Sequence, residues 1–369
     1  MRTVGVEEEL LLVAPDGGSA MAVAAEALGH ADALGLRRTP GDEPGGVIEH
    51  EMTRQQLEVD TRPRAALDAL EEEVRALRAR AATVARAAGA EVAALATFPL
   101  PAQPLVVAKP RYEAMAARFG ETAREYLACG CHVHVGVTDR QEAVGVLDRV
   151  RGWLPPLLAL SANSPYWQGR DTDYHSFRSQ LMGRWPSAGP PDLYGSAAAY
   201  DAAVTAMIGS GVLLDPGMVY FDARPSHRYP TLEIRVADVC LDPEDTVLVA
   251  GLVRALVETA AQAWARHEPP PATPTAFLRL QDWQAARDGL SADLVDPRTG
   301  RPAPAADVLA ALVDHVASAL EASGDTDLVH GGLDRVLARG SGATRQREVL
   351  ARTGSLADVV RDAVAVTTG

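Results

Sequence analysis

The stretch TVGVEEELLLV, residues 3–13, sets three consecutive glutamates inside an otherwise apolar run. Side chains alternate between the two faces of a β-strand. In a strand, Glu7 and Glu9 would share one face, opposite Glu8 and the apolar residues Val4, Val6, Leu10 and Leu12. Two interpretations are open at this point: a solvated edge strand whose charges have no role, or a strand that directs two carboxylates at a divalent cation.

Three further segments have the same two-faced pattern and favour the second interpretation. They are QQLEVDT (55–61), CGCHVHVGV (129–137) and TLEIRVADV (231–239), and VYFDARPS (219–226) resembles them. In each, one face is apolar and the other carries glutamate, histidine, aspartate or arginine. We therefore predict an α+β fold, in which helices cover one face of an antiparallel sheet and the other face lines a cleft.

Helical periodicity accounts for much of the remaining chain. Apolar residues recur every three or four positions from Arg64 to Gly89, which predicts a helix. Further helices are expected from Gln141 to about Leu160 (perturbed by two prolines), over Asp201–Ile208 and over Thr246–Arg266. After HEPPPATPT (267–275) the chain is expected to be mostly helical, with a turn at DPRTG (296–300). We predict one catalytic domain over 1–369, with a core of about 1–266 and a helical C-terminal portion of about 274–369.

Composition excludes several classes of partner. The net charge of −14 and the pI near 5.1 argue against binding to nucleic acid or to an anionic membrane. Three cysteines are too few for a disulfide framework, which favours a reducing compartment. We find neither a secretory signal nor an apolar span of 18 residues, and expect a cytoplasmic protein.

The polar strand faces carry the residue types of a metal site that binds phosphate. Carboxylates joined by one or two imidazoles favour Mg²⁺ or Mn²⁺ over zinc. Arginines that follow in the 224–235 segment would neutralise a moving phosphoryl group. Neither a G-x-x-x-x-G-K-[ST] loop nor a G-x-G-x-x-G turn after a strand is present. A nucleotide would therefore bind through metals and arginines.

The CGCHVHV segment also has a rival interpretation, because cysteines and histidines this close are typical of zinc sites, and His-x-His strands occur in metal-dependent hydrolases. Alternation sends Cys129 and Cys131 to the face opposite His132 and His134, so the four cannot meet on one ion. We expect the cysteines in the core and leave the role of His134 open. Two arginines elsewhere, Arg178 and Arg184, are equally compatible with structural ion pairs.

Six segments, taken in order, resemble the glutamate–cysteine ligase type 2 family of ATP-dependent carboxylate–amine ligases. They are GVEEELLLV, QQLEVDT, CGCHVHVGV, ALSANSPYWQGRDT, RPSHRYPTLEIRVADV and GATRQR, and they extend over nearly the whole chain. The resemblance implies a glutamine-synthetase-like fold: a curved antiparallel sheet flanked by helices, with metals and substrates on its concave face.

The same resemblance assigns roles to individual residues. It implies that the metals are held by Glu7, Glu9, Glu58, His132 and Glu233. Arg235 would lie near the transferred phosphate, in both a catalytic and a nucleotide-binding role; Arg224 would assist catalysis and Arg228 would help to bind the nucleotide. Where relatives often have Gly-Thr-His-Pro, this chain has Ala-Thr-Phe-Pro at 96–99, which leaves recognition of the amine open.

The function that follows is an ATP- and Mg²⁺-dependent ligase, with Mn²⁺ as a substitute. A small-molecule carboxylate, glutamate by family default, would be activated as an acyl phosphate and joined to an amine such as cysteine. The alternatives are a metal-dependent hydrolase that uses the His-x-His strand and a non-catalytic relative that binds nucleotide. A homodimer is compatible with the resemblance. Because Glu8 faces the apolar side, we expect Glu8→Gln to retain activity far better than substitution of Glu7 or Glu9.

Overall fold

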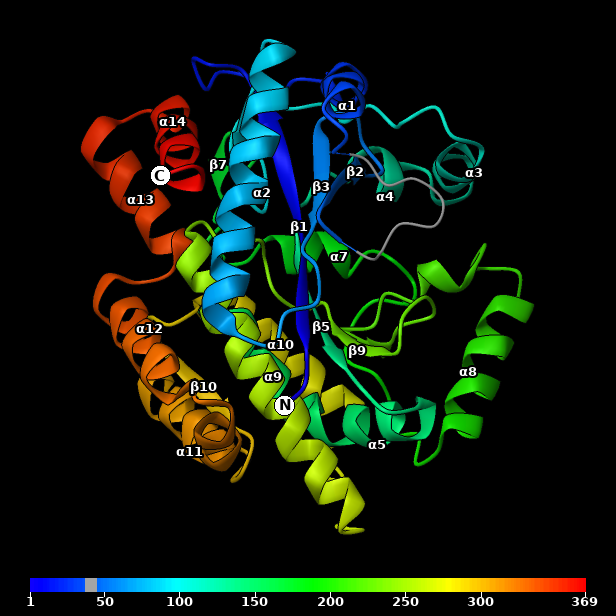
Figure 1. Cartoon of the computed structure of the whole chain (residues 1–369). Helices are drawn as coiled ribbons and strands as arrows, with labels where there is room; N and C mark the ends of the chain where they lie inside the picture. Colours follow the sequence, from blue (N-terminus) through cyan, green and yellow to red (C-terminus); the bar gives the residue numbers. More distant parts are fainter. Residues whose placement is uncertain (37–44) are drawn as a thin grey trace.

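An antiparallel β-sheet organises the part of the chain described by the computed structural model, residues 1–36 and 45–369 (Figure 1). Its strands follow one another in the order β2–β3–β1–β5–β9–β8, and β4 pairs with the far end of β1. Every strand pair in this sheet is antiparallel, which confirms the predicted α+β class. The strands are β1 (Val4–Val13), β2 (Val47–His50), β3 (Gln56–Asp60), β4 (Glu91–Ala93), β5 (Cys131–Gly136), β8 (Ala223–Pro225) and β9 (Thr231–Ile234).

The register of the central strands brings their polar residues level with one another. Glu7 of β1 lies opposite His132 of β5, and Glu9 lies opposite Glu58 of β3. On the next strand, His134 lies opposite Glu233. Because residues directly opposite in antiparallel strands project from the same face, these side chains converge on one side of the sheet.

Helices cover the apolar side of the sheet. α2 (Leu67–Ala87) lies across β1 in Figure 1, α9 (Pro243–Ala265) packs beside α2, and α5 (Arg140–Val150) packs beside α9. The alternate residues of the strands that face these helices are fully buried with them; they include Val4, Val6, Val133, Val135, Leu232 and Ile234. The predicted alternation is therefore confirmed for both faces of the sheet: the apolar residues face the helices and the polar residues face the other side.

The predicted helices are present, with one correction. The segment from Gln141 to Leu160 is not one helix but α5, a 3₁₀ turn at Arg151–Trp153 and α6 (Leu154–Ser161). The two prolines at 155 and 156 lie in the first turn of α6, where their missing N–H groups cost nothing. The helix expected over Asp201–Ile208 is α8 (Ala197–Gly209).

The C-terminal portion is mostly helical, as predicted, and the expected turn at 296–300 joins a short hairpin. Its elements are α10 (Thr275–Asp288), β10 (Asp293–Asp296), β11 (Arg301–Pro304), α11 (Ala305–Ser323), α12 (Thr326–Arg339), α13 (Gly342–Thr353) and α14 (Leu356–Thr367). α11 and α12 pack on α9, and α14 packs on β4. Shorter elements complete the chain: α1 (Ala24–Ala33), α3 (Pro110–Phe119), α4 (Glu121–Arg124), β6 (Tyr166–Trp167), β7 (Arg170–Asp171), α7 (Arg178–Met182) and a 3₁₀ turn at Pro216–Met218.

The sequence was expected to contain no apolar span of 18 residues, and this expectation is wrong. By length and composition, α9 could cross a membrane. However, 78% of the most apolar 18-residue stretch of α9 is buried inside the fold, where α9 contacts the sheet and α11. A central core helix is apolar on all sides for the same reason as a membrane helix, since neither contacts water. The composition of α9 is thus explained by its place in the core.

Candidate metal and phosphate site

The polar face of the sheet forms the floor of a cleft of about 540 Å³. Segments around Lys109–Tyr112 and Asp215–Tyr229 form its walls. Every site residue expected from the sequence lines this cleft: Glu7, Glu9, Glu58, His132, Arg224, Arg228, Glu233 and Arg235. The structure therefore brings together residues that are up to 228 positions apart (Glu7 to Arg235) in the chain.

Glu7 lies between the two histidines of β5. Its carboxylate oxygens are 3.4 Å from His132 Nδ1 and 3.1 Å from His134 Nε2. Burial, aided by the charge of Arg235, lowers the pKa of His132 to about 4, so this imidazole is neutral near pH 7 and able to bind a metal. Burial also opposes the charged form of Glu7, but the two histidines outweigh it and lower the pKa of its carboxyl.

Acidic and imidazole side chains form three groups, two of which share Glu58, and within each group the ligand atoms lie within 4.8 Å of one another. The first is Glu7, His134 and Glu233; the second is Glu9, Glu51 and Glu58; the third is Glu49, Glu58 and Asp60. Groups rich in carboxylate oxygen, with at most one imidazole, are the donor sets that suit Mg²⁺ or Mn²⁺.

The second and third groups are electrostatically crowded. Burial and the neighbouring charge of Glu51 raise the pKa of Glu9 to about 8. Burial, together with Asp60 and Glu51, raises the pKa of Glu58 well above its usual range. Carboxylates packed this closely repel one another unless a cation lies between them. The residues present therefore fit divalent cations.

The sequence did not predict three members of these groups as metal ligands, namely Glu49, Glu51 and Asp60. The role of a fourth member, His134, was left open. The signal for the first two was available, because IEHE (48–51) alternates in the same way as the other strands. Glu49 lies directly opposite Glu58 in the sheet. β2 has only four residues, so its alternation is a weaker signal than that of the longer strands.

Two arginines hold Glu233. Arg224 donates to both of its carboxylate oxygens, at 2.8 and 3.2 Å, and its remaining Nη1 donates to the carbonyls of Gly217 and Val219. Arg235 also donates to Glu233, and its Nη1 lies 3.3 Å from His132 Nδ1. Burial opposes ionisation of Glu233, but the two guanidinium groups outweigh it and keep the pKa of this carboxyl well below its usual value.

These contacts separate the roles of the three arginines. The donors of Arg224 are committed to protein atoms, so it positions Glu233 and the loop that carries Gly217 and Val219. Arg235 lies at the cleft floor between Glu233 and His132, facing the first ligand group. Arg228 is exposed at the rim.

The rival interpretations of other motifs are resolved by their contacts. Cys129 and Cys131 are fully buried and free, on the apolar side, so they form no zinc site with the histidines. Arg178 is 3.8 Å from Asp238, and Arg184 is 2.8 Å from Glu125, so both arginines form ion pairs.

The GATRQR segment (342–347) also has a structural role. Arg345 and Arg347 pair with Asp362 and Asp171, at 2.7 and 2.8 Å, and Gln346 donates to Asn163. The segment thus ties α13 to α14 and to the 163–171 loop.

An apolar cavity of about 420 Å³ adjoins the cleft. Three residues, Glu7, His134 and Tyr229, line both spaces. Its other walls include Val6, Pro63, Val137 and Pro230. A flat apolar group could therefore lie here while a charged group attached to it reached the acidic cluster.

A model of the family described as glutamate–cysteine ligase family 2 (GCS2) matches residues 3–362. A relative from Streptomyces avermitilis, whose provisional name is glutamate–cysteine ligase 2-1, is 51% identical over the full length of both chains. A relative from Frankia alni with the provisional name glutamate–cysteine ligase 2-2 is 48% identical, over 98% of this chain and 95% of its own.

Solved structures resemble the fold at much lower sequence identity. A glutamate–cysteine ligase from Francisella tularensis, in complex with AMP, has a TM-score of 0.68 at 14% identity, over 100% of this chain and 89% of its own. A bifunctional glutathione synthetase from Pasteurella multocida has a TM-score of 0.70 at 14% identity, over 100% of this chain and 52% of its own. At this identity the likeness concerns the fold alone.

Proposed function

The chain belongs to glutamate–cysteine ligase family 2, and from that membership we propose that it joins a small carboxylate to an amine, using ATP and Mg²⁺. The observation that carries the proposal is the cleft itself. The members of three ligand groups, except Asp60, face one space together with the guanidinium of Arg235, and that space is large enough for a phosphate chain. Metal ligands and arginines together are typical of phosphoryl-transfer sites, where the negative charge of the transferring phosphoryl group must be neutralised.

The metal ligands would be the acidic groups of β1, β3 and β9 with the histidines of β5. Mg²⁺ at these positions would neutralise the charge of bound phosphates. The crowding that raises the pKa of Glu9 and Glu58 supports this assignment, because a cation relieves it. His132, neutral near pH 7, has a lone pair to offer but lies outside the three groups, whose one imidazole is that of His134. Glu233 stays ionised beside its two arginines.

In the proposed reaction, an oxygen of the substrate carboxylate attacks the γ-phosphorus of ATP, the bond to ADP breaks, and an acyl phosphate forms. The nitrogen of a neutral amine then attacks the acyl carbon. Phosphate leaves, the nitrogen loses its proton, and an amide remains. Arg235, held by Glu233, would neutralise the transferring phosphoryl group, and Arg224 would keep Glu233 in place. The adenine ring would occupy the apolar cavity beside His134.

Glutamate as the carboxylate and cysteine as one candidate amine rest on the names of the relatives. Phe98, where relatives often have histidine, is fully buried in the core beside β1 and β4 and does not line the cleft. In this chain, position 98 therefore contributes to the core and not to the lining of the cleft. A cytoplasmic location and a homodimer stay predictions.

One assay tests the proposal: Mg²⁺-ATP is supplied with a panel of amino acids, with hydroxylamine as a trap, and ADP, AMP, phosphate and hydroxamate are measured. We expect ADP and a hydroxamate, since hydroxylamine attacks an acyl phosphate as an amine does. Release of AMP would replace the acyl phosphate by an adenylate. Turnover of an amide without ATP would favour the metal-dependent hydrolase, and ATP binding without ADP would favour the non-catalytic relative.

A further inference from the structure

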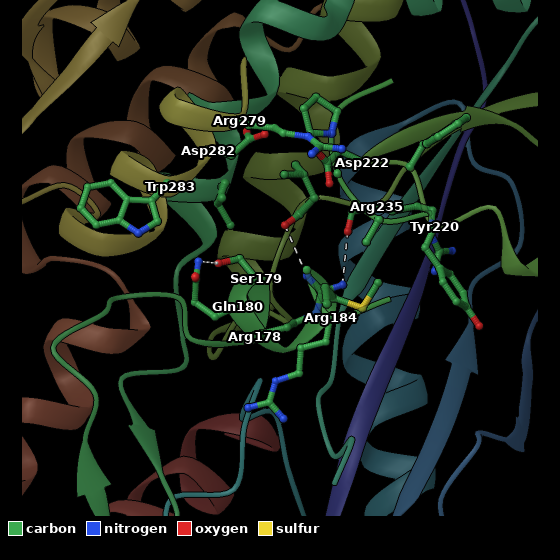
Figure 2. Close-up of a pocket in the computed structure, with 18 residues that line it drawn as sticks. Arg178, Ser179, Gln180, Arg184, Tyr220, Asp222, Arg235, Arg279, Asp282 and Trp283 are labelled. Atoms are coloured by element: carbon green, nitrogen blue, oxygen red, sulfur yellow. Dashed lines mark hydrogen bonds between the residues drawn. The ribbon is translucent and has the colours of Figure 1, made fainter. Parts of the chain in front are cut away.

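A second cavity, of about 360 Å³, lies beside the main cleft between α7, α10 and the segment that precedes β8 (Figure 2). Tyr220 and Arg235 line both spaces, so the cavity adjoins the proposed reaction site. The backbone continues this connection, because the N–H of Arg235 donates to the carbonyl of Asp222 at 2.7 Å. A volume of this size is at the small end of the range for ligand pockets, which suits a small metabolite.

Two aspartates meet in this cavity. Asp222 precedes β8, Asp282 is on α10, and their carboxyl groups hydrogen-bond to each other. Apart from the Asp222 carboxyl, Asp282 Oδ2 has no hydrogen-bond partner in the described part of the chain, and it is shielded from solvent. Burial raises the pKa of Asp222 to about 6, and burial together with Asp222 raises the pKa of Asp282 well above its usual range. The pair therefore retains a proton that an incoming cation would displace.

The arginines around the pair differ in what they already bind. Arg178 donates to the carbonyls of Arg235 and Val236, and Arg235 donates to Glu233. Arg279 lies one turn before Asp282 on α10, and within residues 1–36 and 45–369 its guanidinium makes no hydrogen bond or ion pair. Figure 2 shows Arg279 and Asp282 side by side, close to Asp222. The charge of Arg279 acts on both carboxyl groups, and Arg178 and Arg235 act on Asp222, so each counteracts part of the rise in pKa. The cavity thus presents an arginine whose N–H groups have no acceptor in the described residues, beside an acidic pair with an unpartnered oxygen.

We propose that this side cavity binds the amine substrate as a zwitterion, an α-amino acid whose ammonium group lies on Asp222 and Asp282 and whose carboxylate lies on Arg279. The proposal rests on the ligase function in taking the bound molecule as the acceptor. A divalent cation fits the pair less well, because Mg²⁺ and Ca²⁺ take six or more oxygen ligands. In the described residues, no group of three metal-ligand side chains includes Asp222 or Asp282.

Calorimetric titration of the whole protein with glycine, L-alanine, L-cysteine and L-glutamate tests the proposal directly. Each titration is run without nucleotide and again with Mg²⁺ and a non-hydrolysable ATP analogue, so that ordered binding is not missed. The strongest binder is then compared with its own analogues that lack either the ammonium or the carboxylate group. We expect each analogue to bind at least about tenfold more weakly, because both charges of the amino acid are used.

The matched variants are D222N/D282N and D288N. Two asparagines keep a hydrogen bond between the positions but remove the negative charge, and we expect amino-acid affinity to fall at least about tenfold. Asp288 is on the same helix and does not line the cavity, so D288N should bind as the wild type does. Circular dichroism and unchanged Mn²⁺ binding would show that the double variant is folded with its main cleft intact.

The outcomes separate this inference from the proposed ligase. Unchanged affinity in D222N/D282N, equal binding of the analogue without ammonium, or no binding of any of the four amino acids would overturn the side cavity as an amine site. Hydroxamate formation in the wild type would still stand in each case. Conversely, absence of ADP with every substrate would overturn the ligase, while the titrations would still report whether the cavity binds amino acids.

Discussion

The carboxylate of Glu8 and the guanidinium of Arg78 form a two-pronged ion pair, at 2.6 and 2.8 Å, in the interior between β1 and α2. The side chains are 2% and 0% exposed. Thr246 of α9 donates to the same carboxylate at 2.7 Å, and Arg78 also donates to the carbonyls of Cys240 and Leu241. This pair therefore joins the sheet to the two helices that cover it.

Glu8→Gln is expected to destabilise the protein by about 3–5 kcal/mol, because it leaves the guanidinium of Arg78 buried without a counter-charge. The sequence alone predicted only that this variant retains activity, and the structure adds the expected loss of stability. Activity of the folded fraction should survive, since Glu8 faces away from the cleft. Urea denaturation measures the loss of free energy of unfolding, and ADP release at low temperature measures the activity.

The control is Glu91→Gln, which removes the partner of the half-exposed Arg86 at the surface. An exposed pair contributes at most about 1 kcal/mol, so this variant should unfold close to the wild type. Equal losses in Glu8→Gln and Glu91→Gln would contradict the structural role of the buried pair.

Glu58→Gln is expected to separate stability from metal binding. Burial and the neighbouring charges of Asp60 and Glu51 raise the pKa of Glu58, so a neutral side chain relieves repulsion when no cation is bound. In EDTA the variant should therefore melt at or above the temperature of the wild type. With Mg²⁺ or Mn²⁺ the wild type should gain stability, by about 2.7 kcal/mol at 100 times its Kd, and the variant should gain much less.

Thermal melts with and without each metal, with Mn²⁺ binding followed by electron paramagnetic resonance, would measure both effects. Glu72→Gln, an exposed position on α2, is the control and should respond to metal as the wild type does. An undiminished metal response in Glu58→Gln would remove Glu58 from the ligand set.

Strand alternation predicted which of the named side chains line the cleft, because they lie on a regular sheet. A period of two fixes the face of every residue once one face is known to be apolar, and this placed Glu7, Glu9 and Glu58 correctly in the cleft. Alternation does not say what a side chain binds on that face. The commitment of Arg224 to Glu233 and to two loop carbonyls depends on the path of the 215–219 segment, which no local pattern encodes.

Contacts between segments that are distant in sequence could not be predicted either. The partner of Glu8 is 70 residues away on a helix whose charged residues look alike in sequence. Asp282 is 60 residues from Asp222, in the portion for which only helicity was expected. Which arginine or aspartate of an amphipathic helix meets the sheet is decided by tertiary packing, and a single sequence does not contain that information in readable form.

Gly130→Ala is expected to reduce activity through crowding. A Cβ atom at this position would overlap Arg178 Nη2 and lie 3.0 Å from His132 Nε2. Gly130 also holds Glu9, because its N–H donates to the Glu9 carboxylate at 2.7 Å. Two proposed metal ligands would therefore shift together, and we expect ADP release to fall at least about tenfold, as small displacements at reacting centres do.

Gly209→Ala is the matched substitution, since a Cβ atom there meets nothing within 4 Å and the residue is the last of α8. It should leave activity unchanged and raise stability by up to about 1 kcal/mol through helix propensity. Full activity in Gly130→Ala would show that the Arg178 and His132 positions tolerate movement, against the proposed ligand geometry.

The three cysteines are expected to be unreactive in the native protein. Cys129, Cys131 and Cys240 are buried, and burial raises the pKa of each thiol far above its usual value. The thiolate is the form that attacks electrophiles and binds zinc, so both functions are suppressed. A thiol-specific disulfide reagent should therefore release no chromophore from the folded protein and three equivalents after denaturation in guanidinium.

The same experiment distinguishes the two interpretations of the CGCHVHV segment. If the cysteines were zinc ligands or a covalent nucleophile, native protein would react with the reagent or would lose activity on alkylation. The ligase proposed here needs neither, because the acyl group is activated on phosphate and the histidines face the opposite side of β5. Rapid modification of even one thiol, accompanied by loss of ADP release, would contradict a purely structural role for these residues.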